Sequence, residues 1–441
     1  MSAAFPSVHS LGETRSPRTF ATWYYNRMSD LTYPIRPISD DEFRASYQMV
    51  SEAFSSTHPL EPELEIDRPL VELERTLGAF DGPRIVGNAV GLTFQMALPG
   101  TVAPVLGVTG VAVRQTHRRR GVLRSLMTRQ LTDLHDAGRE PVAVLFASES
   151  AIYGRYGYGS ATTGATLTMH AGETRFVPEA PADPALRLRD AAPADAVPEM
   201  AKVFDAQLGA RPGAFARNDA WWASVVADPE YRREGFGPLM CVLAEDDAGT
   251  RGYVLFSARG SDDADEIPDG SLAVRELYAA DPAAYAALWA HVLGRDLIRT
   301  VTAPLRPSDD PLLRLLADPR RARPRMIDGM WARLVDVDRA LTARAYSSPA
   351  DAVIEVRDTV CPWNDGRWRL RVGTGGVECA RTGDEPDVTV PVSALGGAYF
   401  GGTRLGSYAA AGLAVEHRPG ALRALSAAFA WDPAPWCPIM F

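Results

Sequence analysis

The clearest pattern in the sequence spans residues 108 to 159 and begins Val-Thr-Gly-Val-Ala-Val at 108–113. Arg-Gln-Thr-His-Arg-Arg-Arg-Gly-Val-Leu-Arg follows at 114–124, and Pro-Val-Ala-Val-Leu-Phe-Ala-Ser-Glu stands at 141–149. The two apolar runs predict buried strands, and the apolar spacing between them is that of one helix face. That face comprises Leu123, Leu126, Met127, Leu131 and Leu134, with Gly138 as the expected C-terminal cap.

The basic turn between the first strand and the helix predicts an anion site. Arg118, Arg119 and Arg120 precede Gly121 at the helix start, where backbone N–H groups are unpaired and the dipole is positive. Glycine lets a ligand approach the backbone closely, so the pattern favours a pyrophosphate site over a solvated arginine turn. The turn has neither the Gly-Lys-Ser/Thr of a P-loop nor the Gly-x-Gly-x-x-Gly of a dinucleotide site.

Composition narrows the class of protein. A length of 441 residues predicts several domains, and a net charge of −9 argues against a nucleic-acid or membrane-surface binder. The four cysteines form no C-x-x-C pair and the histidines show no ligand spacing, so we expect neither a disulfide framework nor a metal. No apolar run is long enough to span a bilayer. Residues 1–30 predict a flexible extension, and Met28 is an alternative start of translation. Because these residues lack the apolar core of a secretory signal, we expect a cytoplasmic location, with secretion left open.

The first domain is expected over residues 31–182. A strand at 33–38 is followed by Ser39-Asp40-Asp41-Glu42, which has the form of a helix capping box. Further strands at 84–98 and 102–113 lead into the basic turn, which predicts an α/β or α+β layer domain. The proline-bearing run 172–185 is the expected linker.

Residues 183–330 faintly repeat the first domain. A strand at 186–190 and a helix at 195–204 follow about one domain length after their first counterparts. After the later strand at 273–279 there is no arginine cluster and no glycine at the helix start, so a similar domain without a phosphate loop is predicted. Chance similarity is the alternative.

Residues 331–441 predict a small α+β domain. Strands at 353–356, 367–372, 376–381 and 387–391 suggest a meander, with Asn364-Asp365-Gly366 as a hairpin turn. The chain ends in an apolar stretch stiffened by Pro433, Pro435 and Pro438. Either this terminus is buried and directed at a site, or it is simply packed in an interface.

The basic turn resembles the acetyl-CoA motif of the GNAT acetyltransferases, Arg/Gln-x-x-Gly-x-Gly/Ala. Arg118 and Gly121 match the motif, whereas Leu123 replaces the usual Gly or Ala. The wider string, with Ala-Ser-Glu at 147–149 and Ile-Tyr-Gly-Arg-Tyr-Gly-Tyr-Gly at 152–159, is similar to the Eis (enhanced intracellular survival) group of actinobacterial N-acetyltransferases. This resemblance implies an α+β chain with a catalytic GNAT domain, a second GNAT-like domain without activity and a sterol-carrier-like domain over 331–441. It also implies a homohexamer and acetyl-CoA as cosubstrate.

Acetyl transfer requires that acetyl-CoA be bound, and we expect the motif region to bind it. Backbone amides at Val111 and Val113 are expected to hold the pantetheine arm and the acetyl oxygen, and the turn from Arg119 to Arg124 the pyrophosphate. The full set of expected cofactor-binding residues is Val111, Ala112, Val113, Arg119, Arg120, Gly121, Val122, Leu123, Arg124, Ser148 and Glu149.

The resemblance also implies the acid and the base. The general acid maps onto Tyr153, ahead of Tyr156 and Tyr158, although an aromatic in such a turn commonly has a packing role. The general base maps onto the terminal carboxylate of Phe441, acting directly or through a water, with Glu149 as the alternative.

The acceptor is expected to be a primary amine of a small molecule or a lysine, with aminoglycosides among the candidates. An acceptor pocket for a polycation would be lined by aromatic or acidic residues. At the positions where we look for such lining, this sequence has Ser56, Gly110 and Met440. A cationic acceptor needs compensating acids, and the nearby sequence offers Glu52, Glu61 and Glu63. The alternatives are a protein that binds CoA or a lipid without turnover and a structural or regulatory protein.

Overall fold

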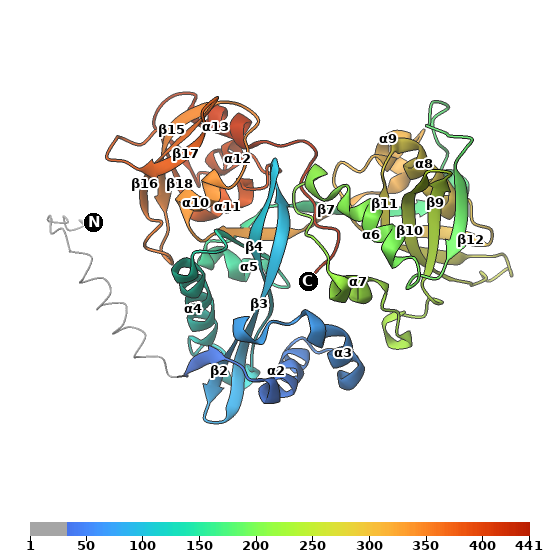
Figure 1. Cartoon of the computed structure of the whole chain (residues 1–441), viewed down its shortest axis with the longest axis horizontal. Coiled ribbons are helices and arrows are strands. Elements are labelled where there is room, and N and C mark those ends of the chain that lie inside the picture. The colour runs from blue at the N-terminus through green and yellow to red at the C-terminus, as the bar shows by residue number, and fades with distance from the viewer. Residues whose placement is uncertain (1–32) are drawn as a thin grey trace, which may run out of the picture.

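The computed structural model describes residues 33–441, so the predicted extension over 1–30 lies outside the described residues. Two seven-stranded sheets and one five-stranded sheet, each with helices, form the units visible in Figure 1. The predicted α+β fold class is confirmed. Between residues 33 and 441, no helix has the length and apolarity needed to cross a membrane.

The first sheet has the strand order β1-β2-β3-β4-β5-β14-β6. Helices cover it, and the long helix after the basic turn buries its predicted apolar face, including Leu126 and Leu131. Gly138 adopts the left-handed cap at φ 60°, and the Ser39 N–H donates to Glu42 Oε2 at 2.9 Å, so both predicted caps are confirmed. The elements are β1 (Ile35–Pro37), α2 (Asp40–Ala53), α3 (Leu60–Asp67), β2 (Thr76–Asp81), β3 (Arg84–Leu98), β4 (Thr101–Val113), α4 (Val122–Ala137), β5 (Val142–Phe146), α5 (Ser150–Tyr153), β6 (Gly159–Ser160) and β14 (Met330–Leu334).

The second sheet repeats the topology of the first. Three antiparallel pairings and then one parallel pairing connect β8 to β12, as they connect β1 to β5. The weak internal repeat in the sequence is therefore a structural repeat. Its elements are β7 (Thr163–His170), β8 (Arg187–Ala191), α6 (Val197–Asp205), α7 (Asp219–Val226), β9 (Met240–Asp246), β10 (Gly249–Arg259), β11 (Gly270–Ala279), α8 (Pro282–Leu293), β12 (Ile298–Pro307), α9 (Leu312–Leu315) and β13 (Arg325–Asp328).

The two sheets exchange one strand each. β7 follows the first unit's β6 but pairs with β12, and β14 follows the second unit's β13 but pairs with β5. The crossing segments touch, because the Gly329 N–H donates to the Thr162 carbonyl at 3.0 Å and a Cβ on Gly329 would lie 2.3 Å from Thr162 Oγ1. The change of sheet after β6 thus precedes the expected boundary at 182, and β14 straddles the expected boundary at 330.

The C-terminal unit differs from the expected meander. β18 pairs in parallel with β15, which gives the order β17-β16-β15-β18-β19. β15 and β16 pair as an antiparallel hairpin, but the expected tight turn at 364–366 is wrong, because residues 358–365 form a longer connection. Asn364 is buried there, and its side chain bonds to the backbone of Val335 and Val337 rather than closing a turn. The elements are α10 (Val337–Thr342), β15 (Ala350–Arg357), β16 (Gly366–Gly373), β17 (Gly376–Arg381), β18 (Val388–Pro391), α11 (Val392–Ala398), α12 (Leu405–Ala410), β19 (Val415–Glu416) and α13 (Ala421–Phe429).

The last residues, 431–441, here called the tail, return from α13 to the middle of the molecule. Figure 1 shows the C-terminus among β3, β7 and α7 rather than at the periphery. One buried apolar cluster joins Phe94 of β3, Phe215 of the second unit and Phe400 of the C-terminal unit. The three units therefore share a core.

Candidate active site

β4 and β5 separate at the edge of the predicted motif. Their parallel pairing ends at Val108 and Leu145. Beyond that point the register of β4 against β3 shifts, and Gly110 adopts φ 55° while its carbonyl accepts a hydrogen bond from Asn88 Nδ2 at 2.9 Å. Such a bulge bends a strand away from its neighbour, which opens the gap, here called the splay, between β4 and the end of β5.

Backbone amides of β4 face the splay. The Arg114 N–H donates to the Val86 carbonyl of β3, and amide directions alternate along a strand. The amides of Val111 and Val113 therefore point away from β3 and into the splay. The amide of Ala112 points to β3 instead, which leaves this predicted residue without a backbone donor in the gap.

The turn before α4 carries vacant donors and cations. Arg119 and the N-cap Gly121 both have positive φ, at 61° and 84°, and the first turn of α4 contains no acidic residue. A Cβ on Gly121 would meet nothing within 4 Å, so there is open space beside the N-cap that precedes the first-turn amides of Val122, Leu123 and Arg124. These features give the turn the geometry of an anion site.

The arginines of this turn differ in their partners. Arg118 Nη2 lies 3.5 Å from Glu149 Oε1, and Arg120 Nη1 donates to the Tyr33 hydroxyl at 3.0 Å. Arg119 and Arg124 are exposed and make no ion pair or hydrogen bond through their side chains with the described residues. They are thus the two cations of the turn that remain to neutralise a ligand.

The corresponding helix of the second unit is already capped. Asp281 precedes α8, and its Oδ1 accepts from the N–H groups of Ala283 and Ala284 at 2.9 and 3.0 Å. Arg251 Nε donates to its other oxygen at 2.8 Å. The first-turn amides therefore have an internal anion, and this helix start offers no room for a phosphate.

The departure of Leu123 from the GNAT motif has a packing explanation. Its side chain is half-buried against a core cluster that contains Met127 and Tyr153. Val122 is buried as well, and a Cβ on Gly87 of β3 would lie 2.6 Å from its Cγ1. The bulkier residues thus occupy the protein side of α4 and leave the open side above Gly121 unobstructed.

Tyr153 ends the short helix α5, close in sequence to the end of β5. Its side chain is buried, and its hydroxyl makes no hydrogen bond with the described residues. Burial, with a smaller contribution from Glu149, raises the pKa of Tyr153 to about 12. Its ring meets that of Tyr158 edge-on at 6.0 Å, and the Tyr158 hydroxyl is fully enclosed without a partner.

The tail ends in the splay. Thr109, the first β4 residue past the pairing with β5, donates its hydroxyl to the terminal Phe441 oxygen at 3.1 Å. The Phe441 ring packs against Phe94, Phe146 and Phe215, with centroid distances of 4.8, 5.3 and 6.0 Å. The last residue is therefore half-buried, with its ring packed in the aromatic cluster and its terminal oxygen at the splay.

Several residues predicted to bind the cofactor or the acceptor are exposed or already ion-paired. Ser148 and Glu149 are exposed at the start of α5, with Glu149 near Arg118. The acids considered for a cationic acceptor are all paired: Glu52 with Arg114, Glu61 with Arg44, and Glu63 with Arg232 of the second unit. Residues 33–441 contain no cluster of three or more His, Cys, Asp or Glu side chains suited to a metal.

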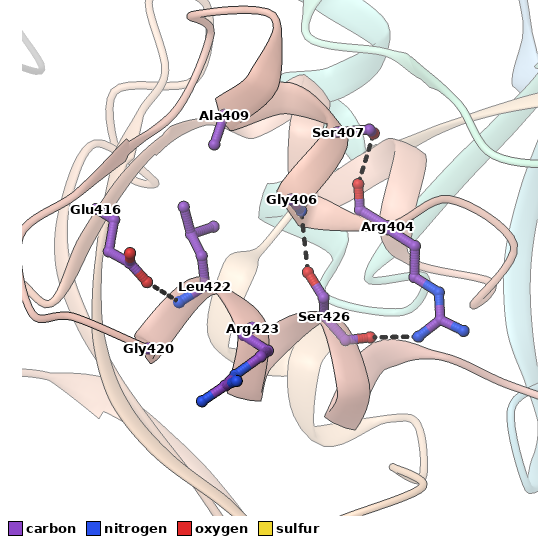
Figure 2. Close-up of a pocket in the computed structure, with 9 residues that line it drawn as sticks. All are labelled: Arg404, Gly406, Ser407, Ala409, Glu416, Gly420, Leu422, Arg423 and Ser426. Atoms are coloured by element: carbon purple, nitrogen blue, oxygen red, sulfur yellow. Dashed lines mark hydrogen bonds between the residues drawn. The ribbon is translucent and has the colours of Figure 1, made fainter.

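A separate groove of about 610 Å³ lies in the C-terminal unit between α12 and α13 (Figure 2). In it the Gly406 N–H donates to Ser426 Oγ, and Glu416 accepts from the Leu422 N–H. None of the residues predicted for cofactor binding or catalysis lines this groove.

Comparison with known proteins agrees with this architecture. Residues 34–161 and 213–351 each match a family model described as an acetyltransferase (GNAT) domain, and residues 337–438 match a sterol carrier protein domain. The N-acetyltransferase Eis of Mycobacterium bovis is 34% identical over 363 residues, covering 80% of this chain and 85% of its own length. The chain belongs to the Eis family of GNAT N-acetyltransferases.

Other relatives extend the similarity over nearly the whole chain. An uncharacterised N-acetyltransferase of Streptomyces avermitilis is 42% identical over 410 residues, covering 92% of this chain and 99% of its own. The crystal structure of Eis1 from Mycobacterium abscessus matches with a TM-score of 0.78 at 35% identity, covering 92% of this chain and all of that one. The tandem GNAT domains and the sterol-carrier-like domain implied by the resemblance are confirmed, and the protein is an N-acetyltransferase.

Proposed function

We propose that this Eis-family protein transfers acetyl from acetyl-CoA to a primary amine, with the chemistry at the splay. The observation that carries the proposal is the position of the terminal carboxylate. Phe441 lies at the point where β4 leaves β5, with its oxygen bonded to Thr109 of β4 and its ring against Phe146 at the end of β5. The segment that bears Tyr153 follows β5 in the chain. A base, a proton donor and backbone donors on adjacent segments are the parts that acyl transfer requires.

The residues present fit acetyl-CoA. Arg119, Arg124 and the first-turn amides of α4 would bind the pyrophosphate, because that turn has vacant donors, free cations and open space. The amides of Val111 and Val113 would hydrogen-bond to the pantetheine arm and to the thioester oxygen. Bound in this way, the cosubstrate supplies the activated acetyl group.

Tyr153 would donate one proton during the transfer, and the Phe441 carboxylate would accept another. The raised pKa of Tyr153 keeps its phenol protonated, so it is able to give a proton to the departing thiolate sulfur. The Phe441 carboxylate would take a proton from the amine, directly or through one water. A free α-carboxylate has a pKa of roughly 3.5, so it is ionised at neutral pH and can accept a hydrogen bond from the amine.

The acceptor is a small-molecule amine or a lysine, and aminoglycosides are one class to test. The experiment is a screen of amine acceptors that measures thiol release from acetyl-CoA together with acetylated product. Release that depends on an amine supports the proposal. CoA binding without release for any acceptor would favour the alternative of a protein that binds CoA or a lipid without turnover.

Two further proposals do not depend on the site's geometry. The family resemblance implies a homohexamer, and the lack of a secretory apolar core in residues 1–30 favours a cytoplasmic location. Light scattering at micromolar concentration tests the first, because a monomer mass would refute it. Fractionation of the producing cells tests the second.

A further inference from the structure

The second unit holds the tail although its own helix start has no room for a phosphate. The tail passes along the second unit before it reaches the splay (Figure 1). Residues 435–438 of the tail are buried, whereas Met440 is 66% exposed. The second unit therefore holds the middle of the tail rather than its last residues.

An ion pair of the second unit binds both backbone groups of Ala434. Arg211 Nη1 donates to the Ala434 carbonyl and lies 2.5 Å from Asp309 Oδ1. The Ala434 N–H donates to Asp309 Oδ2 at 2.9 Å. Because one peptide closes the bridge between the two side chains, the pair fixes this part of the tail in position and direction.

Two residues after Ala434, Trp436 makes two hydrogen bonds with the second unit. Its N–H donates to the Pro212 carbonyl at 2.8 Å, and its indole Nε1 donates to the Leu305 carbonyl at 2.5 Å. Leu305 has φ 53°, a costly conformation for leucine, within an irregular stretch of β12. A Cβ on Gly213 would lie 2.7 Å from the Trp436 carbonyl oxygen, so only glycine permits this approach.

The same segment of the second unit attaches to the first sheet. The Gly213 N–H donates to the Ala97 carbonyl at 2.8 Å, and the Ala97 N–H donates to the Ala214 carbonyl at 2.7 Å. Phe215 stacks on Phe94 of β3 at 4.1 Å and also meets the Phe441 ring. Residues 211–216 thus connect the tail to the strand that neighbours β4.

We propose that residues 211–216, Leu305 and Asp309 form a clamp that sets where the Phe441 carboxylate lies in the splay. Only residues 437–440 separate the fixed Trp436 from Phe441, so their short span limits where the carboxylate can go. Arg211 and Asp309 are positioning residues, and the second GNAT-like unit serves the first by holding its terminus. The inference rests on the proposed role of the Phe441 carboxylate.

The test compares Arg211→Ala and Asp309→Ala with Arg211→Lys, which keeps a cationic donor. Arg187→Ala is the matched control, because Arg187 pairs with Asp247 in the same unit through an exposed contact at 2.8 Å. Release of phenylalanine by carboxypeptidase A, followed by mass spectrometry, reports on the tail without reference to activity. The kinetic readout is kcat and KM for acetyl-CoA.

We expect both alanine variants to release phenylalanine at least tenfold faster than the parent protein. Their kcat should fall about tenfold to a hundredfold at unchanged KM for acetyl-CoA, because a misplaced group loses rate rather than cofactor binding. Arg211→Lys should recover part of the loss, and Arg187→Ala should match the parent. Trp436→Phe, which removes only the indole donor, should act in the same direction if an alanine variant fails to fold.

Phenylalanine release that stays at the parental rate in all clamp variants would overturn the clamp. Faster release with parental kcat would leave the clamp standing and instead contradict the proposed role of the Phe441 carboxylate. The two failures are therefore distinguishable.

Discussion

Among single residues, burial sets Tyr158 apart from the other two tyrosines of the glycine-rich turn. The Tyr158 hydroxyl is fully enclosed without a partner, and burial raises the pKa of Tyr156 as it does that of Tyr153. Tyr153 and Tyr156 both lie on the segment that follows β5, and neither hydroxyl is among the fully enclosed atoms or bonded to the described residues. The family resemblance assigns the acid to Tyr153.

We predict that Tyr153→Phe lowers kcat by about two to four orders of magnitude with little change in KM for acetyl-CoA. Tyr158→Phe is the control and should cost far less, because it deletes a hydroxyl that bonds to nothing. A raised pKa keeps the phenol protonated as pH rises past 10, so the alkaline loss of kcat should fall near pH 12. Initial rates from pH 7 upward check this, and equal losses in both variants would contradict the assignment.

Among the elements, the two GNAT-like units differ in how their corresponding helices begin. α4 begins after a glycine with open space above it, whereas α8 begins after Asp281, which occupies its own first-turn amides. Local rules predicted the α4 turn well, because glycine, arginine and helix polarity act within a few residues of one another.

We predict that Arg119→Ala with Arg124→Ala raises KM for acetyl-CoA by roughly ten- to a hundredfold, since two charge-assisted contacts are lost. The effect should be larger at low salt, where screening is weaker. Arg129→Ala is the control, because Arg129 pairs with Asp133 within α4. An unchanged KM in the double variant, measured by steady-state kinetics, would remove the phosphate role.

Local patterns failed where distant contacts decide the outcome. Asn364-Asp365-Gly366 has hairpin chemistry, but the Asn364 side chain is taken up by the backbone of Val335 and Val337. β7 and β14 look like ordinary strands in the sequence, and nothing in either shows to which sheet it belongs. Thr109 and Phe215 also carry no local signal. The apolar, proline-stiffened terminus was visible in the sequence, but the family resemblance supplied the roles of Tyr153 and Phe441.

At the scale of the whole molecule, the strand exchange makes the first two units interdependent. Removing the second unit would leave β5 without β14 and β7 without β12. The shared apolar cluster around Phe94 and Phe215 extends the dependence to the core.

We predict that a fragment of residues 33–182 does not fold alone, because it exposes an unpaired strand edge and an apolar face. Its amide NMR spectrum should be poorly dispersed, and its near-ultraviolet circular dichroism weak. The full chain in the same buffer is the control. A dispersed spectrum from the fragment would show that the exchanged strands are dispensable.

If the terminal carboxylate of Phe441 takes part in acetyl transfer, replacing that carboxylate by an amide must slow the reaction. The most direct measurement compares the natural chain with a semisynthetic one that ends in the Phe441 carboxamide, which has nearly the same size and keeps an oxygen for Thr109. The carboxamide cannot accept the amine proton at neutral pH, so we predict a kcat at least a hundredfold lower at unchanged KM for acetyl-CoA. A carboxamide protein with the kcat of the natural chain, its terminus verified by mass spectrometry, would contradict the claim.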